Sequence, residues 1–143
     1  LRRIVERVHQ QLQRLQPKRI VVLGGETAVS PAVVDQLRQH AASGVVERVA
    51  GPDRYATAGQ LATRYPAAVR DTMVATGLDY PDALAGSAVA GARGAPLLLV
   101  RDSSVPSTIQ GALDHLEPWE ITVLGGQASI GDEVVNELVG HVR

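Results

Sequence analysis

The sequence contains no cysteine and no phenylalanine, and its aromatic content is only 3%. Without cysteine there is no disulfide, no thiolate metal site and no cysteine nucleophile. Without phenylalanine the core has to be built from alanine, valine, leucine and isoleucine. The chain of 143 residues is long enough for such a core, since a domain of this size buries roughly two-thirds of the surface that its unfolded chain exposes.

A basic tract and a long apolar run are also missing. The formal net charge is -1, which makes nucleic acid a poor partner because neutralising phosphates drives that binding. No apolar run approaches the ~20 residues of a membrane span, so we expect no membrane partner. Residue 1 is leucine and no signal peptide is visible, so we interpret the chain as part of a longer protein.

The clearest succession of apolar and polar segments lies between residues 73 and 100. Residues 73–76 form a short apolar run, and after a polar loop Asp82 is predicted to cap a helix over 83–92. Because this helix carries apolar or small residues on every side, we expect it to be buried all round. The continuous apolar run 96–100 is typical of a strand in a parallel sheet. The stretch therefore predicts a strand-helix-strand unit with a right-handed crossover.

Alternating strands and helices are predicted along the rest of the chain. Ser30, Asp53 and Asp132 are predicted to cap the helices that follow them. The helix over 107–116 should turn Ile109, Leu113 and Leu116 inward. The further helices are predicted over 1–15, 31–42, 54–65 and 132–141, and the further strands over 20–23, 45–49 and 120–124.

An internal repeat organises the chain. Residues 20–40, IVVLGGETAVSPAVVDQLRQH, return as residues 121–141, ITVLGGQASIGDEVVNELVGH. Self-similarity at a fixed spacing marks a repeat architecture. We interpret residues 1–50 as the C-terminal part of a preceding repeat and 51–143 as one complete repeat, together one compact α/β unit. The predicted fold is α/β, with βα repeats and a mostly parallel sheet carrying helices on both faces.

Four motifs resemble a known family. VAGPDRYATA at 49–58, ATGLDYPDALA at 75–85, PLLL at 96–99 and VLGG at 123–126 follow one another in the order of the cell wall binding repeat of the second type. Such repeats occur, often in threes, in surface-layer proteins and wall-associated hydrolases of Gram-positive bacteria. The resemblance covers nearly the whole chain.

The resemblance implies a non-catalytic module that anchors a larger secreted protein at the cell surface. It implies that the partner is an anionic secondary polysaccharide of the cell wall, that no cofactor is needed, and that the fold is Toprim-like. The family's modules pack around a threefold or pseudo-threefold axis. Since a single repeat would leave apolar surfaces uncovered, we expect a homo-oligomer, with a trimer first and a dimer second.

Two kinds of loop are candidates for chemistry. Gly24-Gly25 and Gly125-Gly126 each lie between a strand and a helix, where backbone N–H groups can hold an anion, although the same pairs can simply make tight turns. Asp79 and Asp82 flank a turn at the carboxyl end of a strand, where acids of a Toprim-like enzyme would hold Mg²⁺. The alternative function is therefore a Mg²⁺-dependent phosphoesterase, and the simpler reading is a loop brace plus a helix cap.

Asp53 and Arg54 could bind a charged sugar, because the guanidinium of Arg54 fits carboxylate or phosphate. Arg54 could equally pair internally with Asp79 or Asp82. Tyr80 and Trp119 are the aromatics suited to stacking on a sugar. No Gly-x-Ser-x-Gly elbow is present, so no catalytic residue is expected, and no metal ligand either. The residues predicted to bind polymer are Arg54, Tyr55, Thr57, Thr76, Asp79, Tyr80, Asp82, Gly24, Gly25, Gly125 and Gly126.

Overall fold

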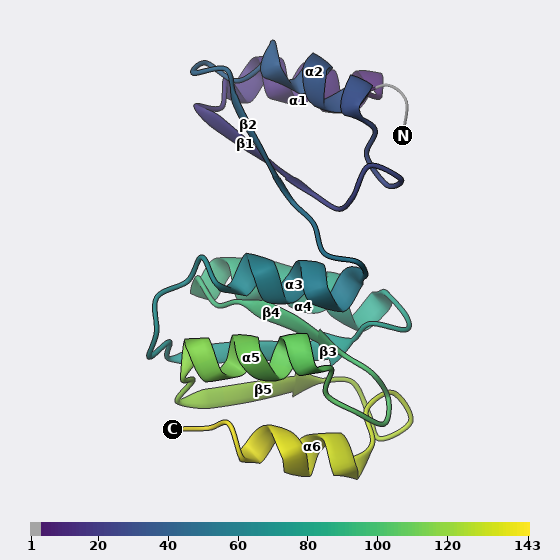
Figure 1. Ribbon diagram of the computed structural model, residues 1–143, viewed down its shortest axis with the longest axis vertical. Coiled ribbons are helices and arrows are strands. Elements are labelled where there is room, and N and C mark those ends of the chain that lie inside the picture. The colour runs from purple at the N-terminus through teal and green to yellow at the C-terminus, as the bar shows by residue number, and fades with distance from the viewer. Residues whose placement is uncertain (1–3) are drawn as a thin grey trace. The chain divides into compact units, whose positions relative to one another are not determined.

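The computed structural model describes residues 4–143 of the chain (Figure 1). These residues form two compact units, Leu1–Pro52 and Asp53–Arg143, which we call the N-terminal unit and the C-terminal unit. Each unit alternates helices with parallel strands, which confirms the predicted α/β class. The predicted division into repeats at residues 1–50 and 51–143 stays a prediction. No helix among the described residues is long and apolar enough to cross a membrane.

The N-terminal unit is a two-stranded sheet with two helices. Its strands pair in parallel, with Arg19 opposite Val45 and Leu23 opposite Val49. A small core joins sheet and helices through Val22, Val33, Val34 and Leu37. The elements are α1 (Glu6–Leu15), β1 (Arg19–Leu23), α2 (Pro31–Arg38) and β2 (Val45–Val49).

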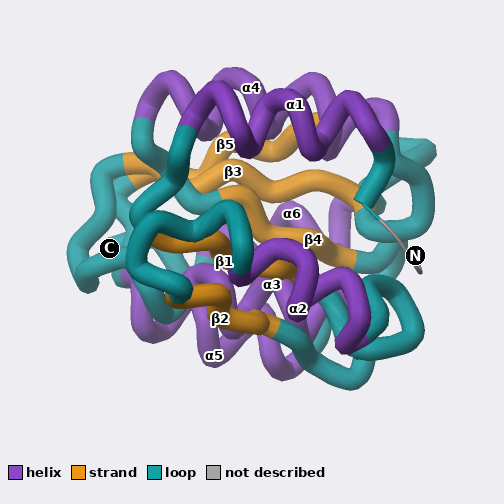
Figure 2. Tube along the Cα trace, turned by 90° about the horizontal axis from the view of Figure 1, so that it is seen from above, coloured by secondary structure: helices purple, strands orange, loops and turns teal. Residues whose placement is uncertain are grey.

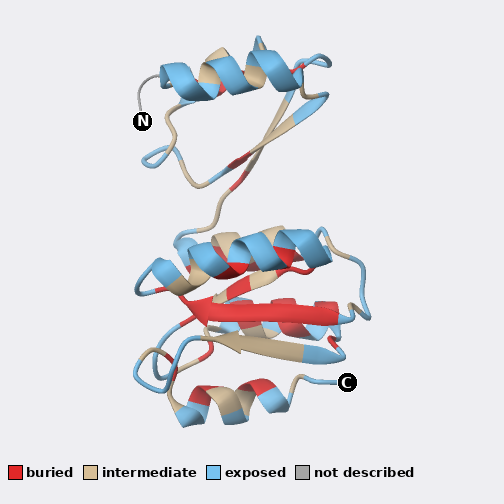
Figure 3. Ribbon diagram, turned by 180° about the vertical axis from the view of Figure 1, so that it is seen from behind, coloured by how far each residue is buried: buried red, intermediate tan, exposed pale blue. Residues whose placement is uncertain are grey.

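The C-terminal unit contains a three-stranded parallel sheet in the order β4-β3-β5. Its central strand, β3, is buried along its whole length (Figure 3). The elements are α3 (Arg54–Ala62), β3 (Asp71–Thr76), α4 (Pro81–Arg93), β4 (Leu97–Val100), α5 (Ser107–Leu116), β5 (Glu120–Leu124) and α6 (Asp132–Val139).

Helices cover both faces of this sheet, as predicted. Figure 2 shows α4 on one side of β5, β3 and β4, and α3, α5 and α6 on the other. The larger core lies on the second side, where Val74 of β3 clusters with residues of these three helices. Ile109, Leu113 and Leu116 are fully buried there, which confirms the inward face predicted for 107–116.

The prediction that the central helix is buried all round is wrong. Within α4 only Gly86 and Ala90 are buried, whereas Leu84 is 66% exposed. The sheet covers one stripe of the helix, which includes Gly86 and Ala90, while other small residues such as Ser87, Ala88 and Gly91 are exposed. An ideal Cβ at Gly86 would lie 2.0 Å from Cδ1 of Leu124 in β5, so the missing side chain lets the helix approach the sheet closely.

The predicted caps have mixed outcomes. Asp53 does cap α3, since its Oδ1 accepts from the Ala56 N–H at 2.8 Å. Asp82 does not cap α4, because the helix already begins at Pro81 after Tyr80. Ser30 occupies the N-cap position of α2 without a side-chain capping bond. Asp132 is the first helical residue of α6, and its carboxylate accepts instead from Nε2 of Gln127 at 2.9 Å.

Three helices end before their predicted last residue. The chain continues after α2, α3 and α6 in tighter turns, with bonds from His40 to Leu37, Tyr65 to Ala62 and His141 to Leu138. Such three-residue bonds tighten a helix end without extending the α-helix. At the start of the chain α1 begins at Glu6, and residues 1–3 of the helix predicted over 1–15 lie outside the described residues.

The internal repeat reappears as repeated geometry at a shift of 101 residues, which carries Ile20 to Ile121. Gly24 and Gly125 follow β1 and β5 with φ angles of 108° and 119°. The copies also share a feature outside the similar sequence: α1 and α5 both end at a left-handed residue, Gln16 and Glu117, with φ angles of 44° and 43°. The structural repeat therefore reaches further toward the N-terminus than the sequence similarity does.

Candidate functional site

Most of the predicted polymer-binding residues meet at one edge of the C-terminal sheet. Because β3, β4 and β5 are parallel, the loops that follow them lie at the same edge, where the next helices begin. We call this the carboxyl edge. Gly24 and Gly25 belong instead to the N-terminal unit, after β1. The predicted residues at the carboxyl edge are Arg54, Tyr55, Thr57, Thr76, Asp79, Tyr80, Asp82, Gly125 and Gly126.

The centre of this edge is a contact between Tyr55 and Gly77. Tyr55 is only 7% exposed and belongs to the core, so its ring supports the edge from below. An ideal Cβ at Gly77 would lie 2.5 Å from Cε1 of this ring, so only glycine fits over it. We call this contact the Tyr55–Gly77 platform.

Two arginines lie against the platform, and we call them the arginine pair. Arg54 donates from Nη1 to the Gly77 carbonyl at 2.5 Å. Arg101, directly after β4, places its guanidinium carbon 5.2 Å from the centroid of the Tyr55 ring. Both residues are exposed. Arg101 was not predicted, and the signal for it is its position as the first residue after an apolar strand.

Arg54 links α3 to the loop after β3 through a hydrogen bond. The predicted tie exists, but the acceptor is the Gly77 carbonyl and not the carboxylate of Asp79 or Asp82, so the predicted internal ion pair is wrong. A guanidinium has five N–H donors in a planar fork. The bond to Gly77 therefore leaves donors of Arg54 for a ligand.

The two aspartates of the loop after β3 have separate surroundings. Asp79 accepts from the Tyr80 N–H at 2.8 Å, as a loop brace would. Asp82 lies over the turn after β5, since an ideal Cβ at Gly125 would lie 2.8 Å from its Oδ2. Within residues 4–143 no group of three or more histidine, aspartate or glutamate side chains is arranged to hold a metal ion.

The two predicted threonines form local bonds. Thr76 is 4% exposed, and its hydroxyl accepts from the Leu78 N–H at 3.2 Å. Thr57 donates its hydroxyl to the Asp53 carbonyl at 2.8 Å, within the first turn of α3. These contacts position the loop and the helix start.

The glycine pairs form matching turns. Gly25 and Gly126 each accept from residues three and four positions later, at 3.1 and 3.0 Å from Ala28 and Val29 in the first turn. The same turns lead into α2 and α6, which fits the tight-turn reading; the anion-binding role stays a prediction. Arg48 of β2, which was not predicted, braces the first turn by donating to the carbonyls of Gly24 and Val29, the latter at 2.7 Å.

The two exposed aromatics lie at opposite edges of the sheet. Tyr80 follows β3 and is 74% exposed at the carboxyl edge. Trp119 precedes β5 and is 59% exposed, with the guanidinium carbon of Arg143 5.4 Å from its ring centroid. They cannot contribute to one stacking site within a single C-terminal unit.

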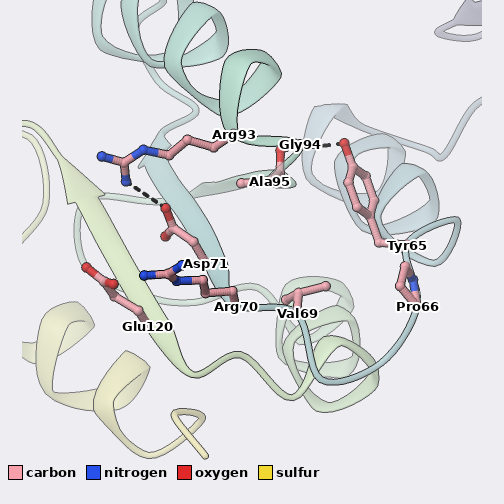
Figure 4. A pocket seen from close by; sticks show the side chains of 9 residues that line it. All are labelled: Tyr65, Pro66, Val69, Arg70, Asp71, Arg93, Gly94, Ala95 and Glu120. Atoms are coloured by element: carbon pink, nitrogen blue, oxygen red, sulfur yellow. Dashed lines mark hydrogen bonds and ion pairs between the residues drawn. The ribbon is translucent and has the colours of Figure 1, made fainter.

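A pocket of about 570 Å³ lies at the opposite, amino edge of the sheet (Figure 4). Asp71, at the start of β3, is largely buried and pairs with Arg93 at 2.8 Å. It also accepts from the Thr122 hydroxyl at 3.3 Å. The sequence did not indicate this pair, because the two residues meet only when α4 returns across the sheet. The pocket is lined by Tyr65, Pro66, Val69, Arg70, Asp71, Arg93, Gly94, Ala95 and Glu120.

The solved structures that are similar to this chain include two proteins from Clostridium difficile. Cwp6 matches 99% of this chain with a TM-score of 0.82 and 26% sequence identity, and the match covers 22% of the Cwp6 chain. Cwp8 matches 90% of this chain with a TM-score of 0.71 and 30% identity, and the match covers 21% of the Cwp8 chain.

Comparison with curated proteins gives two relatives from Bacillus subtilis (strain 168). The amidase enhancer is 27% identical over 135 residues, and the N-acetylmuramoyl-L-alanine amidase LytC is 30% identical over 132 residues. The chain spans only 18% and 26% of their lengths. The family model described as Cell wall binding domain 2 matches residues 48–135. On that match, the chain belongs to the Cell wall binding domain 2 family.

Proposed function

We propose that this chain is a non-catalytic module that anchors a larger, secreted protein to the Gram-positive cell wall by binding an anionic secondary wall polymer. Family membership and the wall-associated relatives support the anchoring role. The observation that carries the proposed site is the arginine pair, which places two exposed guanidiniums on the Tyr55–Gly77 platform.

In this proposal the arginine pair binds the acidic groups of the polymer. Arg54 and Arg101 present planar donor forks that match phosphate or carboxylate oxygens. The N-terminal ends of the helices that begin at this edge add a favourable potential for negative charge. The carboxylates of Asp79 and Asp82 accept from sugar hydroxyls, and the exposed ring of Tyr80 stacks on a sugar face.

The remaining predicted residues have supporting roles in this proposal. Thr57 and Thr76 fix the helix start and the loop that carry the site. The turns at Gly24-Gly25 and Gly125-Gly126 offer backbone N–H groups to further acidic groups along the polymer.

The alternative, a Mg²⁺-dependent phosphoesterase using Asp79 and Asp82, receives no support from the family or from the relatives. The amidase activity in the name of LytC belongs to that protein, of which the chain spans 26%. We therefore place any catalytic activity of the intact protein outside residues 48–135.

We further propose that the module works as a homo-oligomer, a trimer first and a dimer second. The outer face of α4 and the loop before it expose Leu78, Leu84 and Val89, which suit a contact with another copy. Light scattering across the micromolar range tests this: an oligomer that Leu84→Glu dissociates supports the proposal, and a monomer at every concentration contradicts it. Val139→Glu is the matched control, because Val139 is 65% exposed on α6.

The anchoring function is tested by sedimenting the protein with purified Gram-positive cell walls. The walls are used before and after acid extraction, which removes the secondary polymers. The proposal predicts binding to intact walls and loss of binding to extracted ones. Equal binding to both, or no binding to either, would overturn the assignment of the polymer as ligand.

A further inference from the structure

We infer that the free edge of β5 is a docking site for a parallel strand of the β2 type, supplied by a following repeat. β5 is the last strand in the order β4-β3-β5, so one of its sides has no partner strand in the C-terminal sheet (Figure 2). Such an edge presents a row of backbone groups that another extended segment can pair with.

The N-terminal unit contains the occupied version of this edge. β1 corresponds to β5 at the shift of 101 residues, and β2 pairs in parallel with β1 over five residues, from Arg19 and Val45 to Leu23 and Val49. The same shift carries β2 past Arg143. The described part of the chain therefore has no counterpart of β2 beside β5.

Three backbone groups distinguish the occupied turn from the empty one. After β1, the Gly24 N–H donates to the Val49 carbonyl at 2.9 Å, and Arg48 donates to the carbonyls of Gly24 and Val29. All three bonds join this turn to residues of β2.

After β5, the equivalent groups are the N–H of Gly125 and the carbonyls of Gly125 and Ile130. None of the three has a hydrogen-bond partner among residues 4–143. The rest of this turn repeats faithfully, with Ser129 and Ile130 donating to the Gly126 carbonyl at 2.8 and 3.1 Å. The turn is thus already shaped for a strand that is missing.

The chemistry of the occupant follows from β2. It is a strand of five residues, mostly β-branched, with an arginine at the fourth position, as in VVERV at Val45–Val49. Its arginine would donate to the Gly125 and Ile130 carbonyls, and its last carbonyl would accept from the Gly125 N–H. Helix α6 leaves room for it, because α6 follows β5 as α2 follows β1, and β1 still pairs with β2.

The test adds the missing strand to the full chain. A copy of residues 43–52 is placed directly after Arg143. The spacing is right, because the Arg143 N–H donates to the Pro118 carbonyl at 2.8 Å just as the Ala42 N–H donates to Pro17 at 2.9 Å. The control carries the same segment with Glu47→Pro and Val49→Pro in the added copy, since proline cannot donate to a strand ladder.

The readout is amide hydrogen exchange at Gly125, compared between the two extended chains. The inference predicts that the added strand slows this exchange about tenfold or more and that the proline control does not. Equal exchange at Gly125 in both chains would overturn it. Protection of Gly125 in the unextended chain that grows with protein concentration would assign the edge to a second copy of this chain and would also overturn it.

Discussion

The ring of Tyr55 lies directly beneath Gly77, so closely that an ideal Cβ at Gly77 would stand 2.5 Å from Cε1 of the ring. This contact joins the start of α3 to the end of β3. It also carries both members of the arginine pair, one on the carbonyl of Gly77 and one over the face of Tyr55. The stability of the C-terminal unit and the shape of its proposed binding edge therefore depend on the same contact.

Gly77→Ala is expected to destabilise the C-terminal unit by about 1–3 kcal/mol, because the added methyl meets a rigid ring in a packed site. In a Tyr55→Leu background the ring is gone, so the same substitution should cost at least about 1 kcal/mol less. Chemical denaturation of the four chains measures this coupling. Equal costs in both backgrounds would show that the methyl does not meet the ring.

Two helical glycines, Gly59 and Gly111, allow the effect of close backbone packing to be compared with the effect of helix propensity. An ideal Cβ at Gly59 of α3 would lie 2.8 Å from the Thr108 carbonyl oxygen, whereas Gly111 of α5 has open space around it. Gly59→Ala should therefore lower the free energy of unfolding by about 1–3 kcal/mol. Gly111→Ala should raise it by about 0.5–1 kcal/mol, since alanine is the better helix former. Thermal melts of the two variants check this, and a stabilising Gly59→Ala would refute the close approach of α3 to α5.

The ion pair at the amino edge should contribute more to the stability of the folded chain than an exposed ion pair does. Asp71 has a 10% exposed side chain bonded to Arg93 and Thr122. Asp71→Asn should cost about 1.5–3 kcal/mol, in the range for hydrogen bonds to a charged group. Glu117→Gln is the matched control, because Glu117 and its partner Arg143 are each 51% exposed, and it should change stability by less than about 1 kcal/mol. If denaturant unfolding showed similar losses of stability for Asp71→Asn and Glu117→Gln, the expectation that the buried pair contributes more would be contradicted.

Residue spacing was enough to predict much of the fold. The strands at 45–49 and 120–124 and the helix at 107–116 have the predicted bounds, because each is a clear apolar pattern between turn residues. The inward face of α5 followed from its 3.6-residue period. The exposure of α4 could not be predicted from residue spacing, because the burial of an apolar helix depends on how many strands and helices cover it.

The site was predictable in part for similar reasons. Parallel strands bring their following loops together, so Arg54, Asp79 and Gly125 could be assigned to one edge. The acceptor for Arg54 could not be assigned, because every residue carries a carbonyl and only the fold places that of Gly77 in reach. Arg101 was missed because its contact with Tyr55 depends on α3 packing against β4, which residue spacing does not reveal.

Loss of the Arg54 side chain should affect stability only modestly. The Arg54–Gly77 bond is a single contact to a neutral carbonyl at an exposed residue, so Arg54→Ala should cost no more than about 1.5 kcal/mol. A melting curve decides this before any binding experiment. A loss of 3 kcal/mol or more, the range for breaking a buried ion pair, would mean that Arg54 neutralises a buried carboxylate after all.

The central claim is that the arginine pair holds the wall polymer, and calorimetric titration with acid-released polymer tests it most directly. Arg54→Ala and Arg101→Ala should each weaken binding about tenfold, as loss of a charge-assisted contact would. Arg70→Ala is the matched control, because it removes the same charge from the pocket at the opposite edge of the sheet. It should bind like the unaltered chain. If Arg70→Ala weakens binding while both carboxyl-edge variants bind normally, the site lies at the amino edge and the claim is wrong.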